Sequence, residues 1–367
     1  MKAVFDIRDL LLLSSIPGVG ANRLKALVTH FGSPTAALSA SPRDLVRVEG
    51  IEKKLASSIA HFQRGKEFVE DQLSRLNKIN GQIITLWDEN YPESLSKIYD
   101  PPPFLFVSGS IEHNDKYALA IVGTRHPTPY GKLIAERFAQ ELVEKGITIV
   151  SGLARGIDTI AHHTAVNAFG RTIAVIGSSL DIMYPAENKK LAAHIAEKGA
   201  VISEFFMGTK PDPGNFPRRN RIISGMSLGT LIVETAENGG AMITASAALD
   251  QNRELFCIPG HITEKYSSGT NKLIRDGHAK LVLSVEDIVA ELEPALRPIL
   301  KTSPVKPSLE LSAFEQKIYD LIGDEAIHID VIAERSTLSI SDALVNLLSL
   351  EFKGAIRQLA GKMFVRT

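Results

Sequence analysis

Seven short apolar segments alternate with amphipathic segments between residues 117 and 292, and this alternation constrains the fold more than any other feature of the chain. The apolar segments have the length of buried strands, and the longer amphipathic segments have the length of helices. Such alternation predicts an α/β domain, an extended Rossmann-like, doubly wound parallel sheet. We expect strands near residues 118–122, 147–150, 172–176, 200–203, 229–233, 254–258 and 280–283, and helices near 129–145, 155–169, 188–198, 242–251 and 270–277.

Glycines and polar residues follow several of the expected strands. In doubly wound sheets, ligands bind beyond the carboxyl ends of the strands. Gly123-Thr124-Arg125 ends the first strand and a helix is expected from about Pro129, so free N–H groups, the helix dipole and a guanidinium would face one anion. The sequence therefore predicts a phosphate site at this edge. The residues that fall there after the first two strands include Gly123, Thr124, Arg125, Ser151, Gly152, Arg155 and Gly156.

A second candidate segment, residues 215–221, has three arginines and two asparagines around one phenylalanine. An aromatic ring among arginines is typical of proteins that bind single-stranded nucleic acid, because bases stack on the ring and phosphates contact the guanidiniums. Alternatively, the arginines bind a single phosphate, or internal carboxylates such as Glu204 and Glu234. An apolar helix is expected after Arg221. The glycine loop 267–272, with Thr270 and Asn271, is a weaker anion candidate at another helix start.

Two kinds of enzyme are less favoured. The G-x-G-x-x-G fingerprint of dinucleotide-binding proteins is absent after the first strand, and no acidic residue ends the second strand. Asp158 and His162 are four residues apart on one helix face, but no third ligand has helical spacing to them. We expect instead an Asp158–His162 contact that fixes the helix start. The sequence thus predicts no catalytic residue, no metal site and no cofactor.

Composition excludes further classes. The formal net charge of -1 excludes a bulk polycation but leaves room for a local basic groove. The single cysteine, Cys257, excludes an intramolecular disulfide and a multi-cysteine zinc site, and we expect it to be a buried thiol. No secretory signal and no run of about 18 apolar residues is evident, so we expect a cytoplasmic protein that does not contact membranes.

The flanking regions predict two smaller domains. Residues 1–75 are expected to be helical, with a helix-hairpin-helix at Ile16-Pro17-Gly18-Val19-Gly20, whose glycines either approach a phosphate or serve packing alone. A second hairpin at Val48–Glu52 has glutamates on both sides of its glycine and is expected to be structural. Residues 76–116 are expected to connect the domains through short strands at 83–87 and 104–107, and residues 117–292 are expected to form the Rossmann-like domain that contains the candidate nucleic-acid-binding segment.

Four prolines in residues 293–309 predict an extended linker. Residues 310–367 are then expected to form a winged helix, from three helices at 313–322, 329–334 and 341–350 and a strand-turn-strand at 356–365. The third helix has Asp342 and no basic residue, and from residue 308 onward there are six Lys/Arg against nine Asp/Glu. This excess of negative charge favours contact with another protein, or support of the dimer, over recognition of DNA by the winged helix.

Some ten motifs, among them IVGTR, SGLARGID, FPRRNRII and SGTNKLI, occur in the order of the DprA/Smf family, which the chain resembles over essentially its whole length. The resemblance implies a DNA-processing protein of natural transformation that binds and protects incoming single-stranded DNA, loads the RecA recombinase onto it and displaces single-strand-binding protein. It also implies a homodimer without a nucleotide cofactor. The family's G-S-R turn falls on Gly123, Thr124 and Arg125, and its F-P-x-R-N segment falls on Phe216, Pro217, Arg218, Arg219 and Asn220.

The chain departs from the family pattern at two places. Thr124 replaces a serine but keeps a hydroxyl, whereas Gly239 and Ala241 stand where many members have serines. We therefore predict no DNA contact for Gly239 or Ala241. A nucleotide-binding or phosphoribohydrolase-like enzyme of the related lysine-decarboxylase-like fold is the alternative, because Gly229-Thr230 and Glu234 resemble part of its motif. A RecA-scaffolding module without DNA contact is a third possibility.

Overall fold

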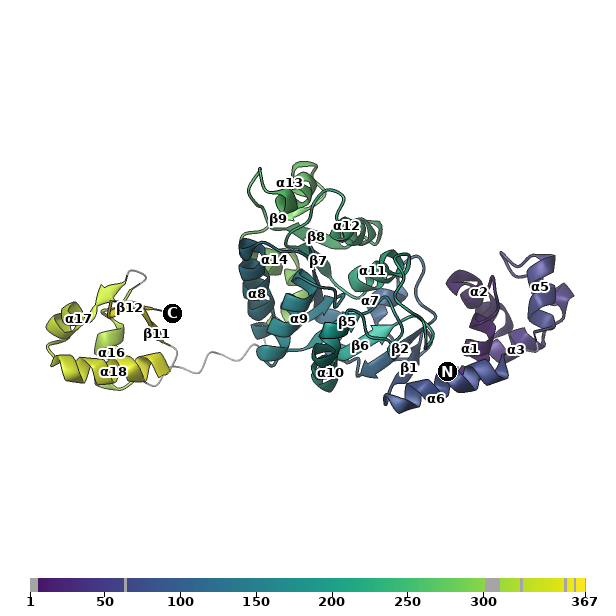
Figure 1. The fold of residues 1–367 in the computed structure, drawn as a ribbon, viewed down its shortest axis with the longest axis horizontal. Helices are drawn as coiled ribbons and strands as arrows, with labels where there is room; N and C mark the ends of the chain where they lie inside the picture. Colours follow the sequence, from purple (N-terminus) through teal and green to yellow (C-terminus); the bar gives the residue numbers. More distant parts are fainter. Residues whose placement is uncertain are drawn as a thin grey trace. The chain divides into compact units, whose positions relative to one another are not determined.

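The computed structural model describes residues 6–62, 65–300, 311–323, 326–352, 355–359 and 361–366. The chain divides into two compact units, Met1–Lys301 and Thr302–Thr367 (Figure 1). None of the helices in these described ranges is long and apolar enough to cross a membrane.

The helical start of the first unit contains the predicted tandem hairpins. Gly18 turns the chain between the first two helices with a φ of +92°, a value that L side chains rarely adopt. Leu10, Leu24 and Leu27 are completely buried, which shows that both arms of the hairpin pack on a common core. The helices are α1 (Ile7–Ser14), α2 (Ala21–Phe31), α3 (Pro34–Ser39), α4 (Pro42–Leu45), α5 (Lys53–Ala60) and α6 (Lys66–Lys78).

A nine-stranded sheet forms the centre of the first unit, in the order β1-β2-β6-β5-β4-β3-β7-β8-β9. The expected connecting segment supplies β1 and β2, which join the sheet as antiparallel strands, while β3 to β9 are parallel. The predicted doubly wound parallel sheet is therefore confirmed for β3 to β9, and the two antiparallel strands from the connecting segment extend it beyond the prediction. The strands are β1 (Gln82–Thr85), β2 (Phe104–Gly109), β3 (Ala118–Val122), β4 (Thr148–Ser151), β5 (Thr172–Val175), β6 (Ala200–Ser203), β7 (Gly229–Ile232), β8 (Glu254–Cys257) and β9 (Lys280–Leu281).

Helices cover both faces of this sheet (Figure 1). One face packs on α8 (Pro129–Glu144), α9 (Ile157–Asn167), α10 (Lys189–Lys198) and α14 (Val285–Glu291). The other face packs on α7 (Glu93–Ser96), α11 (Asn215–Gly225), α12 (Gly240–Asp250) and α13 (Ser268–Arg275). Short 3-10 turns lie at His113–Tyr117, Ala186–Asn188 and Lys265–Ser267. The crossover helices change face between the β3–β6 half and the β7–β9 half, so the topological switch point lies between β3 and β7.

The extended linker predicted for 293–309 is wrong for residues 293–300, which form α15 (Glu293–Leu300). Leu296 is completely buried in the core shared with α14, and this burial favours the helix. An ion pair between Arg297 and Glu293, one helical turn apart, adds to it. The rest of the predicted linker, residues 301–309, lies outside the described residues.

The second unit is the predicted winged helix. Its elements are α16 (Ala313–Tyr319), α17 (Ile329–Ser336), α18 (Ile340–Phe352), β10 (Ile327–His328), β11 (Ile356–Leu359) and β12 (Met363–Arg366). The predicted strand pair β11–β12 gains a third strand, because β10 pairs with β12. Leu347 and Leu350 of α18 are completely buried in the small core, whereas Ile340 and Val345 are exposed.

Candidate nucleic-acid interface

A pocket of about 420 Å³ lies at the switch point, beyond the carboxyl ends of β3 and β7. The turn after β3, the first turns of α11 and the start of α12 form its walls. This is the edge of the sheet at which the sequence predicts the candidate ligand site. The predicted residues that line it are Gly123, Thr124, Arg125, Phe216, Pro217, Arg219 and Asn220.

The start of α8 does not offer a free anion site, so that part of the sequence prediction is wrong. Glu234, 1% exposed, accepts a hydrogen bond from the Thr128 N–H at 2.9 Å and one from the Thr128 hydroxyl at 2.5 Å. Its backbone oxygen also accepts the Thr124 N–H at 2.7 Å. A Cβ on Gly131 would lie 2.2 Å from the Glu234 carboxylate, which explains the glycine there. An internal carboxylate therefore occupies the helix N-terminus.

Arg125 and Phe216 form one wall of the pocket. Arg125 is exposed, and its guanidinium carbon lies 5.4 Å from the centroid of the Phe216 ring, a cation–π contact. The half-buried ring lies 5.9 Å from the ring of Tyr184 and rests on Gly177, where a Cβ would come within 2.9 Å of it. The wall thus presents a charged group and an aromatic ring side by side, a combination typical of sites that bind single-stranded nucleic acid.

Arg219 lies beneath this wall and is only 4% exposed. Its Nε has no hydrogen-bond partner in the described part of the chain, where no ion pair includes it either. A Cβ on Gly152 would lie 1.5 Å from Nη1 of Arg219, so only glycine leaves room for the guanidinium. Burial lowers the pKa of Arg219 to about 10, with nearby Asp158 opposing this shift. The side chain is consequently still charged at neutral pH and lacks a bound counter-group.

The arginines of the 215–221 segment point in different directions because the segment is helical. Helix α11 begins at Asn215, earlier than expected, since Pro217 in its first turn needs no backbone hydrogen bond. Arg218 is exposed and lies 5.3 Å from the Phe205 ring. Arg221 pairs with Glu204 at 2.5 Å and with Asp100 at 3.1 Å. The internal-carboxylate alternative is therefore confirmed for Arg221.

Three predicted site residues have side chains that bond to the protein itself. Ser151 is completely buried and donates to the Ile121 carbonyl at 2.6 Å. Thr270, 1% exposed, donates to the Ser267 carbonyl at 3.1 Å. Asn271 donates to the Gly260 carbonyl at 3.0 Å and accepts its N–H at 3.1 Å. Their contacts indicate that they shape the loops around the pocket.

Two further predicted residues, Arg155 and Gly156, are not among those that line this pocket. Arg155 is exposed and pairs with Glu187 through two hydrogen bonds, at 2.5 and 3.1 Å. Gly156 starts α9 with a φ of +80°, and a Cβ there would lie 2.3 Å from the Thr124 carbonyl oxygen. Gly123 is packed as tightly, because a Cβ would lie 2.6 Å from Ile157. Both glycines thus serve close packing of the β3 turn on α9.

The expected Asp158–His162 contact is wrong. His162 Nδ1 lies 2.7 Å from the Thr172 hydroxyl, and Asp158 accepts the Ala154 N–H at 3.4 Å. Burial lowers the pKa of His162 to about 3, so its ring is neutral near pH 7. Burial raises the pKa of Cys257 to about 12, which leaves an unreactive thiol. Within the described residues, no group of three His, Cys, Asp or Glu could hold a metal ion.

Sequence reasoning missed several groups of this site. Tyr184 packs beside Phe216, and Tyr266 lines the pocket. The start of α12, from Gly239 to Ala241, also lines it, although the sequence predicts no DNA contact for Gly239 or Ala241, which lack hydroxyls. The relevant signal is the backbone: a glycine pair before an apolar helix offers N–H groups whatever the side chains are.

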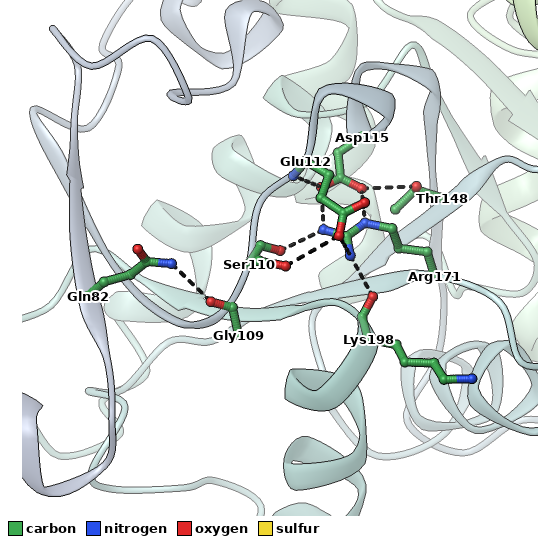
Figure 2. Close-up of polar contacts among 8 residues, drawn as sticks. All are labelled: Gln82, Gly109, Ser110, Glu112, Asp115, Thr148, Arg171 and Lys198. Carbon is green, nitrogen blue, oxygen red and sulfur yellow. Dashed lines mark hydrogen bonds and ion pairs between the residues drawn. The ribbon is translucent and has the colours of Figure 1, made fainter.

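A larger cavity of about 540 Å³ lies elsewhere, lined by Asp88, Glu89, Glu93 and other acidic residues. Its charge disfavours phosphate. The neighbouring network, shown in Figure 2, is built on Arg171, which donates to Asp115 at 2.6 and 2.8 Å and to Glu112 at 3.0 Å. Arg171 also donates to the backbone carbonyls of Ser110 and Lys198. The network ties β5 to the segment before β3 and to the end of α10.

Comparison with known proteins agrees with this architecture. Residues 82–293 match the family model of DNA recombination-mediator protein A, residues 302–362 match the DprA winged helix domain, and residues 10–61 match the SAM-like helix-hairpin-helix tandem. The chain is 35% identical over 390 residues to protein Smf of Synechocystis sp., covering 96% of this chain and 97% of that protein. It is 37% identical over 321 residues to protein Smf of Escherichia coli, covering 85% and 84%.

Two experimental structures are also similar. The X-ray structure of DNA processing protein A from Streptococcus pneumoniae superposes with a TM-score of 0.68 at 33% identity, covering 78% of this chain and 96% of that one. DNA processing protein A from Helicobacter pylori, which binds single-stranded DNA, superposes with a TM-score of 0.53 at 34% identity, covering 58% and 97%. With its three matched domains and these relatives, the chain belongs to the DprA/Smf family of DNA-processing proteins.

Proposed function

We propose that this chain binds single-stranded DNA in the pocket between β3 and β7. The observation that carries the proposal is the combination of an exposed Arg125 against the Phe216 ring with a buried, unpaired Arg219 in one pocket. Phosphates would contact the guanidiniums, and a base would stack beside the ring. The single-stranded DNA binding of the Helicobacter pylori relative supports the same assignment.

As a recombination mediator, the bound protein would protect the incoming strand and load the RecA recombinase onto it, as a homodimer that displaces single-strand-binding protein. Membership of the family supports this part of the proposal. No step of it requires a catalytic residue, and we propose that the protein acts without one.

The phosphoribohydrolase-like alternative is disfavoured by one contact. That function would require Glu234 to be available to a nucleotide. The carboxylate is instead 1% exposed and hydrogen-bonded to Thr128 at the start of α8.

The test is a fluorescence anisotropy titration of the full chain with a labelled single-stranded oligonucleotide, the matching duplex and thymidine monophosphate, at two salt concentrations. We expect the single strand to bind most tightly, with log affinity falling against log salt by about 0.7 for each phosphate contacted. Duplex binding as tight as single-strand binding, or turnover of the monophosphate, would refute the proposed function.

A further inference from the structure

Helix α6, the last helix before the sheet, packs on two loops of the central domain. We call residues 176–185, which follow β5, the β5 loop, and residues 204–214, which follow β6, the β6 loop. Val69 and Leu76 of α6 are 2% and 3% exposed and belong to the same hydrophobic core as Met207 of the β6 loop. The core of the helical start therefore continues into the sheet domain, and both belong to one compact unit.

Gln72 of α6 binds the backbone of the β6 loop. Its side chain is 1% exposed, donates to the Met207 carbonyl at 3.3 Å and accepts the Met207 N–H at 2.6 Å. Both backbone groups of a buried loop residue are thus satisfied by a helix 135 residues away in the chain. Phe68 adds an edge-to-face contact with Phe206, with 5.1 Å between the ring centroids. Together these contacts fix the path of the β6 loop.

Arg75 of α6 contacts both loops through Asp181. Its Nη1 lies 3.3 Å from Oδ2 of Asp181 in the β5 loop, and Oδ1 of Asp181 accepts the Gly208 N–H at 3.0 Å. A Cβ on Gly208 would lie 3.0 Å from the Arg75 guanidinium, so the β6 loop passes close to it. The N–H and the hydroxyl of Ser179 both donate to the Thr209 carbonyl at 3.1 Å. Helix α6 and the two loops therefore form one connected set of contacts.

The same two loops support the side chains expected to contact DNA. Gly177 and Tyr184 of the β5 loop lie against the Phe216 ring. Phe205 of the β6 loop lies 5.3 Å from the guanidinium carbon of Arg218. The β6 loop also leads directly into α11, the helix that carries both Phe216 and Arg218. A displacement of either loop would consequently move these side chains.

We propose that α6 positions Phe216 and Arg218 for single-stranded DNA by holding the β5 and β6 loops. Gln72 and Arg75 would be the positioning residues. The proposal rests on the single-stranded DNA binding proposed above and gives the helical start of the chain a part in it. Gln72 is too deeply buried to touch a ligand, and Arg75 is paired with two aspartates. Their influence on DNA would therefore pass through the loops.

Arg75→Ala and Asp181→Ala test the proposal because they change the charge in opposite directions. If each residue influenced DNA only through its charge, loss of the aspartate would tighten binding. We expect instead that both variants of the full chain bind labelled oligo-dT about threefold more weakly than the wild type in anisotropy titrations. The double variant should bind no more weakly than the weaker single variant, because both remove one shared contact. Unchanged or tighter binding by Asp181→Ala would overturn the proposal.

Gln72→Met removes both bonds to Met207 while keeping a side chain of similar length. We expect it to bind oligo-dT about tenfold more weakly, because two buried backbone groups lose their partner and the loop shifts. Leu27→Ala is the control for destabilisation, since Leu27 is completely buried in α2. With urea denaturation showing that both variants are folded, Leu27→Ala should bind within about twofold of the wild type. Equal affinities of Gln72→Met and Leu27→Ala would overturn the proposal.

A second readout needs no DNA. With 4-fluorophenylalanine in place of Phe216 in the full chain, the ¹⁹F signal reports the surroundings of that ring. We expect Gln72→Met to shift this signal and Leu27→Ala to leave it in place. A signal that Gln72→Met leaves unchanged would overturn the positioning role while leaving single-stranded DNA binding intact. Failure of the wild type to bind oligo-dT would instead refute the proposed function.

Discussion

Two arginines at opposite ends of the parallel strands, Arg171 and Arg219, differ in how they are paired. Arg171, just before β5, contacts two carboxylates and two backbone carbonyls (Figure 2). Burial alone would lower its pKa, but Asp115 and Glu112 outweigh this and raise it. Arg219, beyond the carboxyl end of β4, is more deeply buried and has no such partner. The contrast is between a buried arginine whose hydrogen bonds are complete, which stabilises the fold, and one that we propose binds a phosphate.

The largest effect on stability is expected for Arg171, which lies at the amino ends of the parallel strands. Arg171→Ala should lower the free energy of unfolding by about 3–5 kcal/mol, because Asp115 would remain buried without its cation. Urea denaturation followed by circular dichroism measures this. The double variant Arg171→Ala/Asp115→Asn should recover part of the loss. A decrease of less than about 1 kcal/mol in the free energy of unfolding would show that the network does not stabilise the fold. It would contradict the difference drawn here between Arg171 and Arg219.

Phe216 lies in the pocket at the carboxyl ends of the parallel strands. Phe216→Ala should weaken binding of single-stranded DNA by about 1–3 kcal/mol, as expected for loss of a ring that stacks on a base. Anisotropy titration gives the affinity, and urea denaturation of the same sample gives the stability. The ring also rests on Gly177, so the second measurement is needed. Normal DNA affinity in a destabilised variant would assign Phe216 to packing alone.

Arg125→Ala should cost less, about 1 kcal/mol, since the side chain is exposed, and should reduce the salt slope by about 0.7. Arg155→Ala is the matched comparison, because Glu187 already neutralises Arg155. We expect Arg155→Ala to change the slope less than Arg125→Ala. If Arg155→Ala changed the salt slope more than Arg125→Ala, the DNA strand would instead have to pass on the Glu187 side of the site.

The winged helix should contribute least to DNA affinity. The surface of α18 shows Ile340 and Val345 and has no basic residue, which suits a protein partner better than DNA. Because Leu296 of α15 is buried, the deletion must begin after residue 301. A chain of residues 1–301 should bind single-stranded DNA within about twofold of the full chain. A large loss of affinity would assign DNA contact to the winged helix.

Much of the fold could be predicted because buried parallel strands are continuous apolar runs, and β3 was located to the residue. The same pattern placed Gly123, Thr124 and Arg125 directly after β3, where the structure has them. The occupant of the α8 start could not be predicted, since Glu234 and Thr128 are 106 residues apart in the chain.

The separate roles of the three arginines in α11 could not be predicted either, because they depend on the direction in which each side chain leaves the helix. One turn directs Arg218 to solvent, Arg219 into the pocket and Arg221 toward Glu204. The sequence shows that three arginines are present. Only the packing shows which one is buried without a partner.

The most direct test of this account is Arg219→Gln, measured for both stability and binding. If the role of Arg219 is to bind a phosphate, the variant should be as stable as the wild type or more stable, because an unpaired buried charge is removed. It should also lose about 1.5–3 kcal/mol of single-stranded DNA affinity, as for a hydrogen bond to a charged group, and about 0.7 of the salt slope. A variant that is strongly destabilised but binds DNA with unchanged affinity and salt slope would contradict the account.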